Sequence, residues 1–210
     1  LLRQALSSLK HCGADEELSL SCLKQILRAA LDFEMRESPP EMAMHIHRII
    51  RTALNNEDPY RNLKRQAIEE VLAHEKRIRE LISKSSRPLE TAIRFAIAGN
   101  VLDFALYEWN PDHLSSALDS ALNKKLDIEA LASLETAIGR ASSVMLIGDN
   151  AGESVFDRLL IEQMLPKKVF YAVRGRPAIN DVTWEDALYS GLEHVSILLG
   201  NGSDAPGTLL

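Results

Sequence analysis

The chain has 210 residues, 46% of them hydrophobic and 26% charged, a composition typical of a globular protein. Its net charge of -6 argues against a nucleic-acid partner, because phosphate binding requires a surplus of Lys and Arg on one face. No apolar run approaches the roughly 20 residues that a membrane helix needs, so no membrane partner is expected. The two cysteines are too few for a disulfide framework, and a reducing cytoplasm is the predicted location.

Apolar residues recur at helical spacing over the first part of the chain. Asp15 is predicted to cap one helix, and Pro39 marks the start of the next. Asp58 and Pro59 are predicted to be the cap and the first helical residue of a long third helix. Further helices are predicted to begin near positions 88, 112 and 127.

The pattern changes near residue 140, where short apolar segments begin to alternate with helical ones. The predicted strands are residues 143–147, 168–173 and 195–199, and the predicted helices between them are residues 153–164 and 184–192. This alternation is the signature of a parallel sheet with right-handed crossovers. The chain is therefore predicted to be α/β: a helical domain, residues 1–139, precedes a three-layer α/β domain, residues 140–210, with a mainly parallel, Rossmann-like sheet.

Polar side chains follow the first two predicted strands. Asp149 and Asn150 come directly after the first strand, and Asp181 lies in the loop after the second. The carboxyl ends of parallel strands meet at one edge of a sheet, where ligands collect. Two carboxylates and one amide oxygen suit Mg²⁺ or Mn²⁺. The alternative is that these residues cap the helices that follow, and the spacing does not choose between the two.

Groups that suit a phosphate follow the same predicted strand end. Gly148 and Gly152 let a ligand approach the backbone closely, and the helix that opens with Glu153 offers free N–H groups to an anion. The segment is neither a dinucleotide fingerprint nor a P-loop, so neither kind of nucleotide binding follows from it.

Two later loops also carry candidate phosphate ligands. Arg174 is a candidate to neutralise a phosphate, with a solvated surface arginine as the alternative. Ser203 and Thr208 offer hydroxyl groups from a second polar loop, for which a plain Pro-Gly turn is the alternative.

Several motifs stand in order along the chain. They are Asp149-Asn-Ala-Gly-Glu153 with Phe156-Asp157, Arg174-Gly-Arg-Pro177 with Asn180-Asp-Val-Thr183, Gly202-Ser-Asp-Ala-Pro-Gly-Thr208, Asp58-Pro-Tyr60 with Lys64, and Ala96-Ile-Ala-Gly-Asn-Val-Leu-Asp103. Together they resemble the metal-dependent damage-control phosphatases, a family long catalogued as domain of unknown function eighty-nine. The motifs of the helical half are similar to its stand-alone prokaryotic branch.

The resemblance implies that the protein hydrolyses small phosphorylated metabolites, such as sugar or cofactor phosphates, with a divalent metal that assists attack by water. Mn²⁺ or Mg²⁺ is the expected metal, with Co²⁺ or Ni²⁺ as further candidates. The implied metal ligands are Asp149, Asn150 and Asp181. The predicted catalytic residues are Asp181, Glu153 and Arg174. The predicted substrate-binding residues are Asn100, Asp103, Gly152, Ser203, Asp204 and Thr208.

Two other functions stay open at this point: a carboxyl methyltransferase that uses S-adenosylmethionine, and a module that binds a metal and a phosphorylated metabolite without catalysis. Residues beyond Leu210 are expected in the parent protein, because the last predicted strand would otherwise leave a sheet edge exposed. The oligomeric state is not indicated. Asp181→Ala is expected to change the stability by no more than roughly 1 kcal/mol, as is typical of an exposed loop residue.

Overall fold

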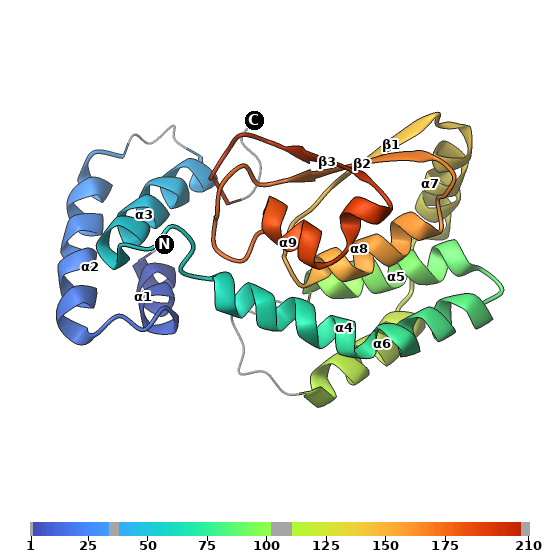
Figure 1. Cartoon of the computed structure of the whole chain (residues 1–210), viewed down its shortest axis with the longest axis horizontal. Coiled ribbons are helices and arrows are strands. Elements are labelled where there is room, and N and C mark those ends of the chain that lie inside the picture. Colours follow the sequence, from blue (N-terminus) through green and yellow to red (C-terminus); the bar gives the residue numbers. More distant parts are fainter. Residues whose placement is uncertain (1, 34–37, 102–110, 207–210) are drawn as a thin grey trace.

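The computed structural model describes residues 2–33, 38–101 and 111–206 (Figure 1). The helices of the first two thirds of the chain are α1 (Leu2–His11), α2 (Glu16–Leu31), α3 (Pro39–Leu54), α4 (Arg61–Lys84), α5 (Pro88–Val101), α6 (Pro111–Asn123) and α7 (Ile128–Arg140). The last third contains β1 (Ser143–Ile147), α8 (Glu153–Glu162), β2 (Lys168–Val173), α9 (Trp184–Tyr189), a 3-10 turn (Leu192–His194) and β3 (Ile197–Gly200).

Most helices begin where local chemistry predicts. The side chain of Asp15 accepts a hydrogen bond from the backbone N–H of Leu18 at 2.7 Å and so caps α2. Asp127 caps α7 in the same way, and α3 and α5 begin at Pro39 and Pro88. These predictions are confirmed, because each depends only on side chains within one turn of the helix start.

The predicted start of α4 is wrong by two residues. The helix begins at Arg61, after a turn formed by Pro59 and Tyr60. The carboxylate of Asp58 does not cap the backbone; it lies 2.8 Å from the ammonium group of Lys64. A charged partner inside the fold has replaced the local capping interaction.

The last predicted helix and strand also shift. Helix α9 ends at Tyr189, because Gly191 adopts a left-handed conformation with φ 79° and the 3-10 turn follows. Strand β3 consequently begins at Ile197, two residues later than predicted.

The strands form a parallel sheet in the order β1-β2-β3. Met145 pairs with Phe170, and Phe170 pairs with Ile197, so these three residues lie in one row across the sheet. Helices α8 and α9 provide the two crossovers between successive strands (Figure 1). The predicted α/β class and the predicted parallel sheet are confirmed.

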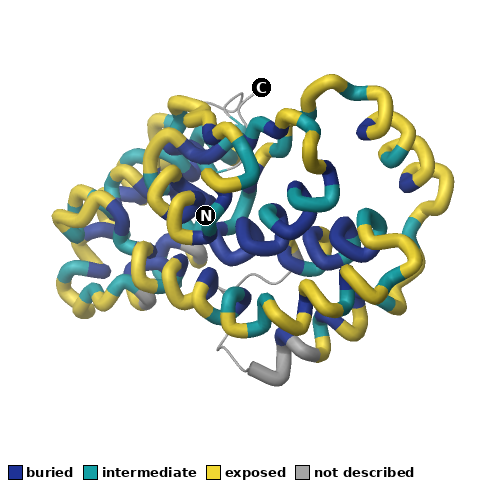
Figure 2. Tube along the Cα trace, turned by 45° about the vertical axis from the view of Figure 1, so that its right-hand side comes forward, coloured by how far each residue is buried: buried dark blue, intermediate teal, exposed yellow. Residues whose placement is uncertain are grey.

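The two faces of the sheet differ. Val169, Tyr171 and Val173 are buried in the main core together with α8, which is itself buried along almost its whole length (Figure 2). The residues between these along the strands point to the opposite face. They are largely apolar, and Met145 and Ile147 are exposed.

Two hydrophobic cores divide the molecule differently from the predicted boundary at residue 139. A small core of Ala5, Leu9, Cys22, Ile26, Ile46 and Ile50 belongs to α1–α3, which form a group at the left of Figure 1. The main core combines side chains of α4–α7 with those of the sheet, α8 and α9. The second half of the helical region therefore packs as part of the α/β unit.

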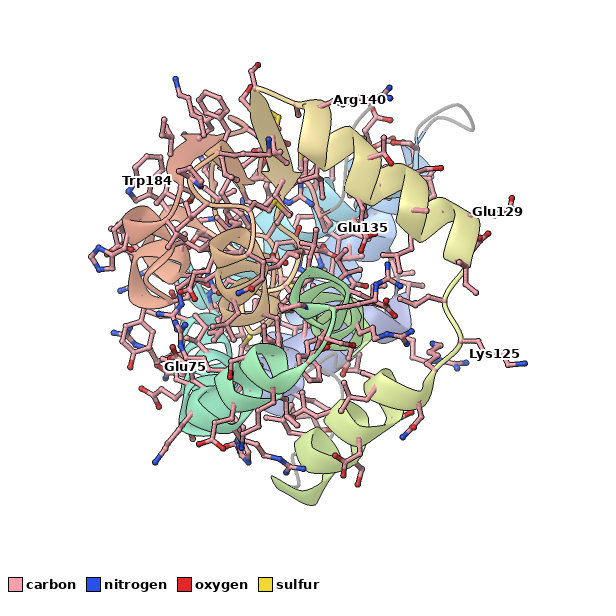
Figure 3. The ribbon with its side chains drawn as sticks, turned by 90° about the vertical axis from the view of Figure 1, so that its right-hand side faces the viewer. Glu75, Lys125, Glu129, Glu135, Arg140 and Trp184 are labelled. Carbon is pink, nitrogen blue, oxygen red and sulfur yellow. The ribbon has the colours of Figure 1, made fainter. Side chains whose placement is uncertain are left out.

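Helix α7 lies at the outside of this unit, with Glu129, Glu135 and Arg140 along it (Figure 3). Arg87 donates to Glu135 at 3.0 Å and so links α7 to the start of α5. In the part of the chain that the structure describes, no helix is long and apolar enough to cross a lipid bilayer.

Candidate functional site

The backbone brings the loops after β1 and β2 side by side. The N–H of Val182 donates to the carbonyl of Asp149 at 2.7 Å, and the N–H of Ala151 donates to the carbonyl of Asn180 at 2.8 Å. Asn150 and Asp181 form an isolated antiparallel bridge between the two loops. The three predicted metal ligands therefore lie on two paired segments at one edge of the sheet.

A side chain from the helical half reaches the same place. The amide nitrogen of Asn100, in α5, donates to Asp149 Oδ2 at 3.0 Å and to Glu153 Oε2 at 3.2 Å. Helix α5 packs closely on α8 here: a Cβ atom on Gly99 would lie 2.6 Å from the ring of Phe156. Asn100, a predicted site residue, thus links the predicted ligand Asp149 to Glu153, which is also a predicted site residue.

The alternative reading of the three predicted ligands, as helix caps, is wrong. The N-cap of α8 is Gly152, and the N-cap of α9 is Thr183. Thr183 forms a capping box with Asp186, whose carboxylate accepts from the backbone N–H of Thr183 at 2.9 Å. The side chains of Asp149, Asn150 and Asp181 are therefore not needed to start either helix.

Asp181 and Arg174 form a buried ion pair. The guanidinium Nε of Arg174 lies 2.5 Å from Asp181 Oδ2, and each residue is only 5% exposed. This geometry excludes the solvated arginine that the sequence left as an alternative. It also overturns the expectation that Asp181→Ala costs little stability, because the substitution would leave a buried cation without its partner.

Two further carboxylates lie on the first turns of α8. The pKa of Glu153 is raised to about 7, mainly by burial; the charge of Asp149 also raises it, and hydrogen bonds from the backbone of Asn150 and from Asn100 partly offset the rise. Asp157, one turn later, is fully buried, and burial and the charge of Glu153 raise its pKa well above the usual range. The hydroxyl of Tyr171 donates to Asp157 at 2.7 Å.

No Lys, Arg or His among the described residues forms an ion pair with Asp149, Glu153 or Asp157. Negative charge that is buried without a partner is costly, so either protons or a bound cation must balance it. Burial and the charge of neighbouring carboxylates likewise raise the pKa values of Glu153 and Asp157.

The donor set fits a hard cation, although it contains few carboxylates. Within residues 2–33, 38–101 and 111–206, no group of three or more His, Cys, Asp and Glu side chains is arranged to hold a metal. The predicted set has only two carboxylates and the amide oxygen of Asn150, which would leave positions for water. The amide nitrogen of Asn180 donates to Asn150 Oδ1 at 2.6 Å and so orients that oxygen.

The predicted substrate-binding residues are distributed unevenly. Gly152 is buried and is the N-cap residue of α8, directly before Glu153. Asp204 instead accepts hydrogen bonds from two arginines of α3, Arg48 at 2.7 Å and Arg51 at 2.6 Å. The roles predicted for these residues stay predictions.

Ser203 joins two strand-end loops through its backbone. Its carbonyl accepts from the N–H of Gly175 at 3.0 Å, and its hydroxyl accepts from the N–H of Ala205 at the same distance. Asp103 and Thr208 lie outside the described residues.

No role was assigned from the sequence to several polar residues around the site. Asp157 carried a local signal, because it lies four residues after Glu153 and therefore on the same face of α8. Arg48 and Arg51 carried none, since their partner Asp204 lies more than 100 positions away in the sequence. Lys64 entered only as part of the motif with Asp58, without a role.

Comparison with known proteins gives consistent matches. A family model described as "Damage-control phosphatase ARMT1-like domain" matches residues 1–210. The chain is 29% identical to an uncharacterized protein of Methanocaldococcus jannaschii, in a match that covers all of the chain and 71% of the relative. It is 31% identical to a damage-control phosphatase of Archaeoglobus fulgidus, covering all of the chain and 74% of the relative.

Two matches come from Pyrococcus horikoshii. A damage-control phosphatase of this organism is 33% identical over 75% of the chain and 54% of the relative. The crystal structure of a DUF89 family protein from the same organism superposes with a TM-score of 0.82 and 26% identity, and the match covers 98% of this chain and 72% of that one.

Proposed function

Because this chain belongs to the damage-control phosphatase ARMT1-like domain family, as its motifs predicted, we propose that it hydrolyses phosphomonoesters of small metabolites, such as sugar or cofactor phosphates. The proposed reaction depends on a divalent cation, Mn²⁺ or Mg²⁺, held by Asp149, Asn150 and Asp181. Relatives from Archaeoglobus fulgidus and Pyrococcus horikoshii carry the name damage-control phosphatase, which supports the reaction class.

The observation that carries the proposal is the uncompensated negative charge between the end of β1 and the first turns of α8. Asp149 and Glu153 share one amide donor, Asn100, and contact no cationic side chain among the described residues. Asp181 follows the neighbouring strand on a loop paired with theirs. A divalent cation would balance this charge, and when bound it would act as a Lewis acid toward a phosphoryl oxygen.

The residues around this edge suit the other needs of phosphate hydrolysis. The first turn of α8 presents backbone N–H groups, which favour an anion. Arg174 uses its Nε for Asp181, and a guanidinium has further N–H donors with which to stabilise negative charge on a phosphoryl group.

Glu153 is the proposed proton acceptor for the attacking water. Burial raises its pKa to about 7, so near neutral pH the group can both take up and release a proton. Asp181 is a poorer candidate for this role, because one of its carboxylate oxygens is already engaged by the buried guanidinium group of Arg174.

The test is release of inorganic phosphate from a panel of sugar and cofactor phosphates, measured with added Mn²⁺ and after chelation. A single turnover in ¹⁸O-labelled water should place one label in the released phosphate. Glu153→Gln should lower the rate by about 100-fold or more, the usual contribution of a general base, and Glu185→Gln, an exposed control, should not change it.

Three results would contradict the proposal. Label recovered only in the alcohol would mean that the carbon–oxygen bond is cleaved on the carbon side. Methyl transfer from S-adenosylmethionine without phosphate release would indicate the methyltransferase. Binding of a metal and a phosphorylated metabolite without turnover would indicate a non-catalytic module.

A further inference from the structure

Two cationic side chains of the helical half hold the loop that carries Asp181. This loop, Arg174–Thr183, connects β2 to α9. Arg51 of α3 donates through Nη1 to the carbonyl of Pro177 at 2.8 Å, and through Nη2 to Asp204 at 2.6 Å. Its side chain is only 12% exposed, so both contacts are shielded from water.

Lys64 of α4 holds the other end of the loop. Its side chain is completely buried, and its ammonium group lies 2.6 Å from Asp186 Oδ2 and 2.8 Å from Asp58 Oδ2. The same oxygen of Asp186 accepts hydrogen bonds from the backbone N–H and the hydroxyl of Thr183. Lys64 therefore stabilises the capping box that fixes the chain two residues after Asp181.

Between these two anchors the loop adopts an unfavourable conformation. Ile179 has φ 47°, in the left-handed region that a β-branched residue rarely occupies. Such a conformation persists only where the surrounding structure enforces it. Ile179, Pro177 and Arg51 line one small cavity between α3 and the loop, so the strained residue lies directly beside the first anchor.

Neither anchor is explained by the packing of its own helix. The core of α1–α3 is separate from the main core, and Arg51 points away from it to the loops after β2 and β3. Lys64 is a charged group in a buried position, where an apolar side chain of similar size is often at least as stabilising. Arg51 contacts the loop that carries Asp181 directly, and Lys64 acts on the end of that loop through Asp186.

We propose that Arg51 and Lys64 are positioning residues that hold the loop Arg174–Thr183 so that Asp181 stays beside Asp149 and Asn150. The inference rests on the proposed function, because it takes Asp181 to be a cation ligand. Without either anchor, Ile179 is free to relax to an unstrained conformation, and Asp181 moves with it. The helical half thereby sets the affinity of the cation site without contacting the cation.

The experiment measures Mn²⁺ affinity of the full chain by calorimetric titration, on variants whose folding is verified by circular dichroism. Arg51→Met should weaken Mn²⁺ binding by about 10- to 100-fold, as is usual when support for metal ligands is removed. Arg51→Lys should restore part of the affinity, since an ammonium group can replace one of the two contacts. Lys64→Met should weaken binding in the same way if the variant folds.

Arg61→Met is the matched control. Arg61 also lies on α4 and pairs with Glu185 of α9 at 2.9 Å, but both side chains are more than 60% exposed. A surface ion pair of this kind contributes little, and the control should bind Mn²⁺ like the unaltered chain.

Unchanged Mn²⁺ affinity in folded Arg51→Met would overturn the inference, even if its melting temperature falls, because the contact would then be merely structural. A failure of the proposed function looks different. In that case the unaltered chain binds no Mn²⁺, or Asp149→Asn binds it with unchanged affinity, and the positioning role is lost together with the site.

Discussion

At the scale of single residues, Glu153 is the group whose burial and charged neighbour bear most directly on the proposed chemistry. It opens α8, accepts hydrogen bonds from Asn100 and from the backbone of Asn150, and lies one turn before the buried Asp157. Its raised pKa has burial as the main cause, with the charge of Asp149 adding to it. The folded protein therefore favours the protonated form of this group, and this preference has a measurable effect on stability.

The pKa of Glu153 rises from an ordinary 4.5 to about 7 on folding, which fixes the sign of the effect. Its contribution to stability is fully present below the unfolded pKa and is lost as the pH rises through the folded pKa. Glu153→Gln has no such loss, so relative to the unaltered chain it should gain stability between about pH 5 and about pH 8. Urea unfolding of the metal-free proteins at both pH values checks this, and an equal difference at the two would contradict it.

Asp181 permits a test that separates its charge from its packing. Asp181→Ala leaves the buried guanidinium of Arg174 unpaired and should cost about 3–5 kcal/mol. Asp181→Asn keeps an oxygen that accepts from Arg174, so its cost should be clearly smaller, while Mn²⁺ binding should be lost in both variants. Chemical unfolding measures the difference, and equal small losses for the two variants would show that the ion pair carries little energy.

Part of the site was predictable from sequence at this scale. Asp149, Asn150 and Asp181 come together because parallel strands place their ends at one edge, and that rule needs only strand positions. The ion pair between Arg174 and Asp181 was not predictable, because it depends on the path of the loop between them. The loop is paired with the segment after β1 and contacts Arg51 of α3, and both are distant in the sequence.

At the scale of elements, the end of β1 is tightly enclosed. A Cβ atom on Gly148 would lie 2.4 Å from the hydroxyl oxygen of Tyr171 and 2.6 Å from a methyl group of Val182. Both neighbours belong to packed parts of the sheet edge, and neither is a flexible surface group. The glycine expected to admit a ligand in fact admits the side chain of Tyr171.

Gly148→Ala should therefore destabilise the fold by about 1–3 kcal/mol or more, the usual cost of overpacking. Gly139→Ala is the control, because a Cβ atom there meets nothing within 4 Å and alanine favours the helical conformation of α7. The control should be neutral or more stable by up to about 1 kcal/mol. Thermal unfolding of the two variants compares them; similar melting temperatures would contradict this account of the end of β1.

Helix starts show where local rules hold and where they fail. Asp15 and Asp127 act as caps because their partners are backbone N–H groups within the same turn. Asp58 has the same local sequence signal but bonds to Lys64, whose burial is decided by the packing of α4 against α9. Capping is predictable only where no stronger tertiary partner competes for the carboxylate.

At the scale of the whole molecule, the order of the elements along the chain does not show how they pack together. The change in pattern near residue 140 marks the first strand, and β1 begins at Ser143. The cores nevertheless join α4–α7 to the sheet and leave α1–α3 with a core of their own. Periodicity shows which residues are apolar on one face of a helix; it does not show which face of another element they meet.

One divalent cation is proposed to bind at the edge of the sheet, where the paired loops after β1 and β2 meet Asn100 of α5. X-ray diffraction at the manganese absorption edge, from a crystal of the full chain soaked in Mn²⁺, tests it most directly. The predicted result is one anomalous peak in contact with Asp149, Asn150 and Asp181, absent from crystals of Asp149→Asn. No peak at these residues, or one on histidine or cysteine side chains instead, would contradict the claim.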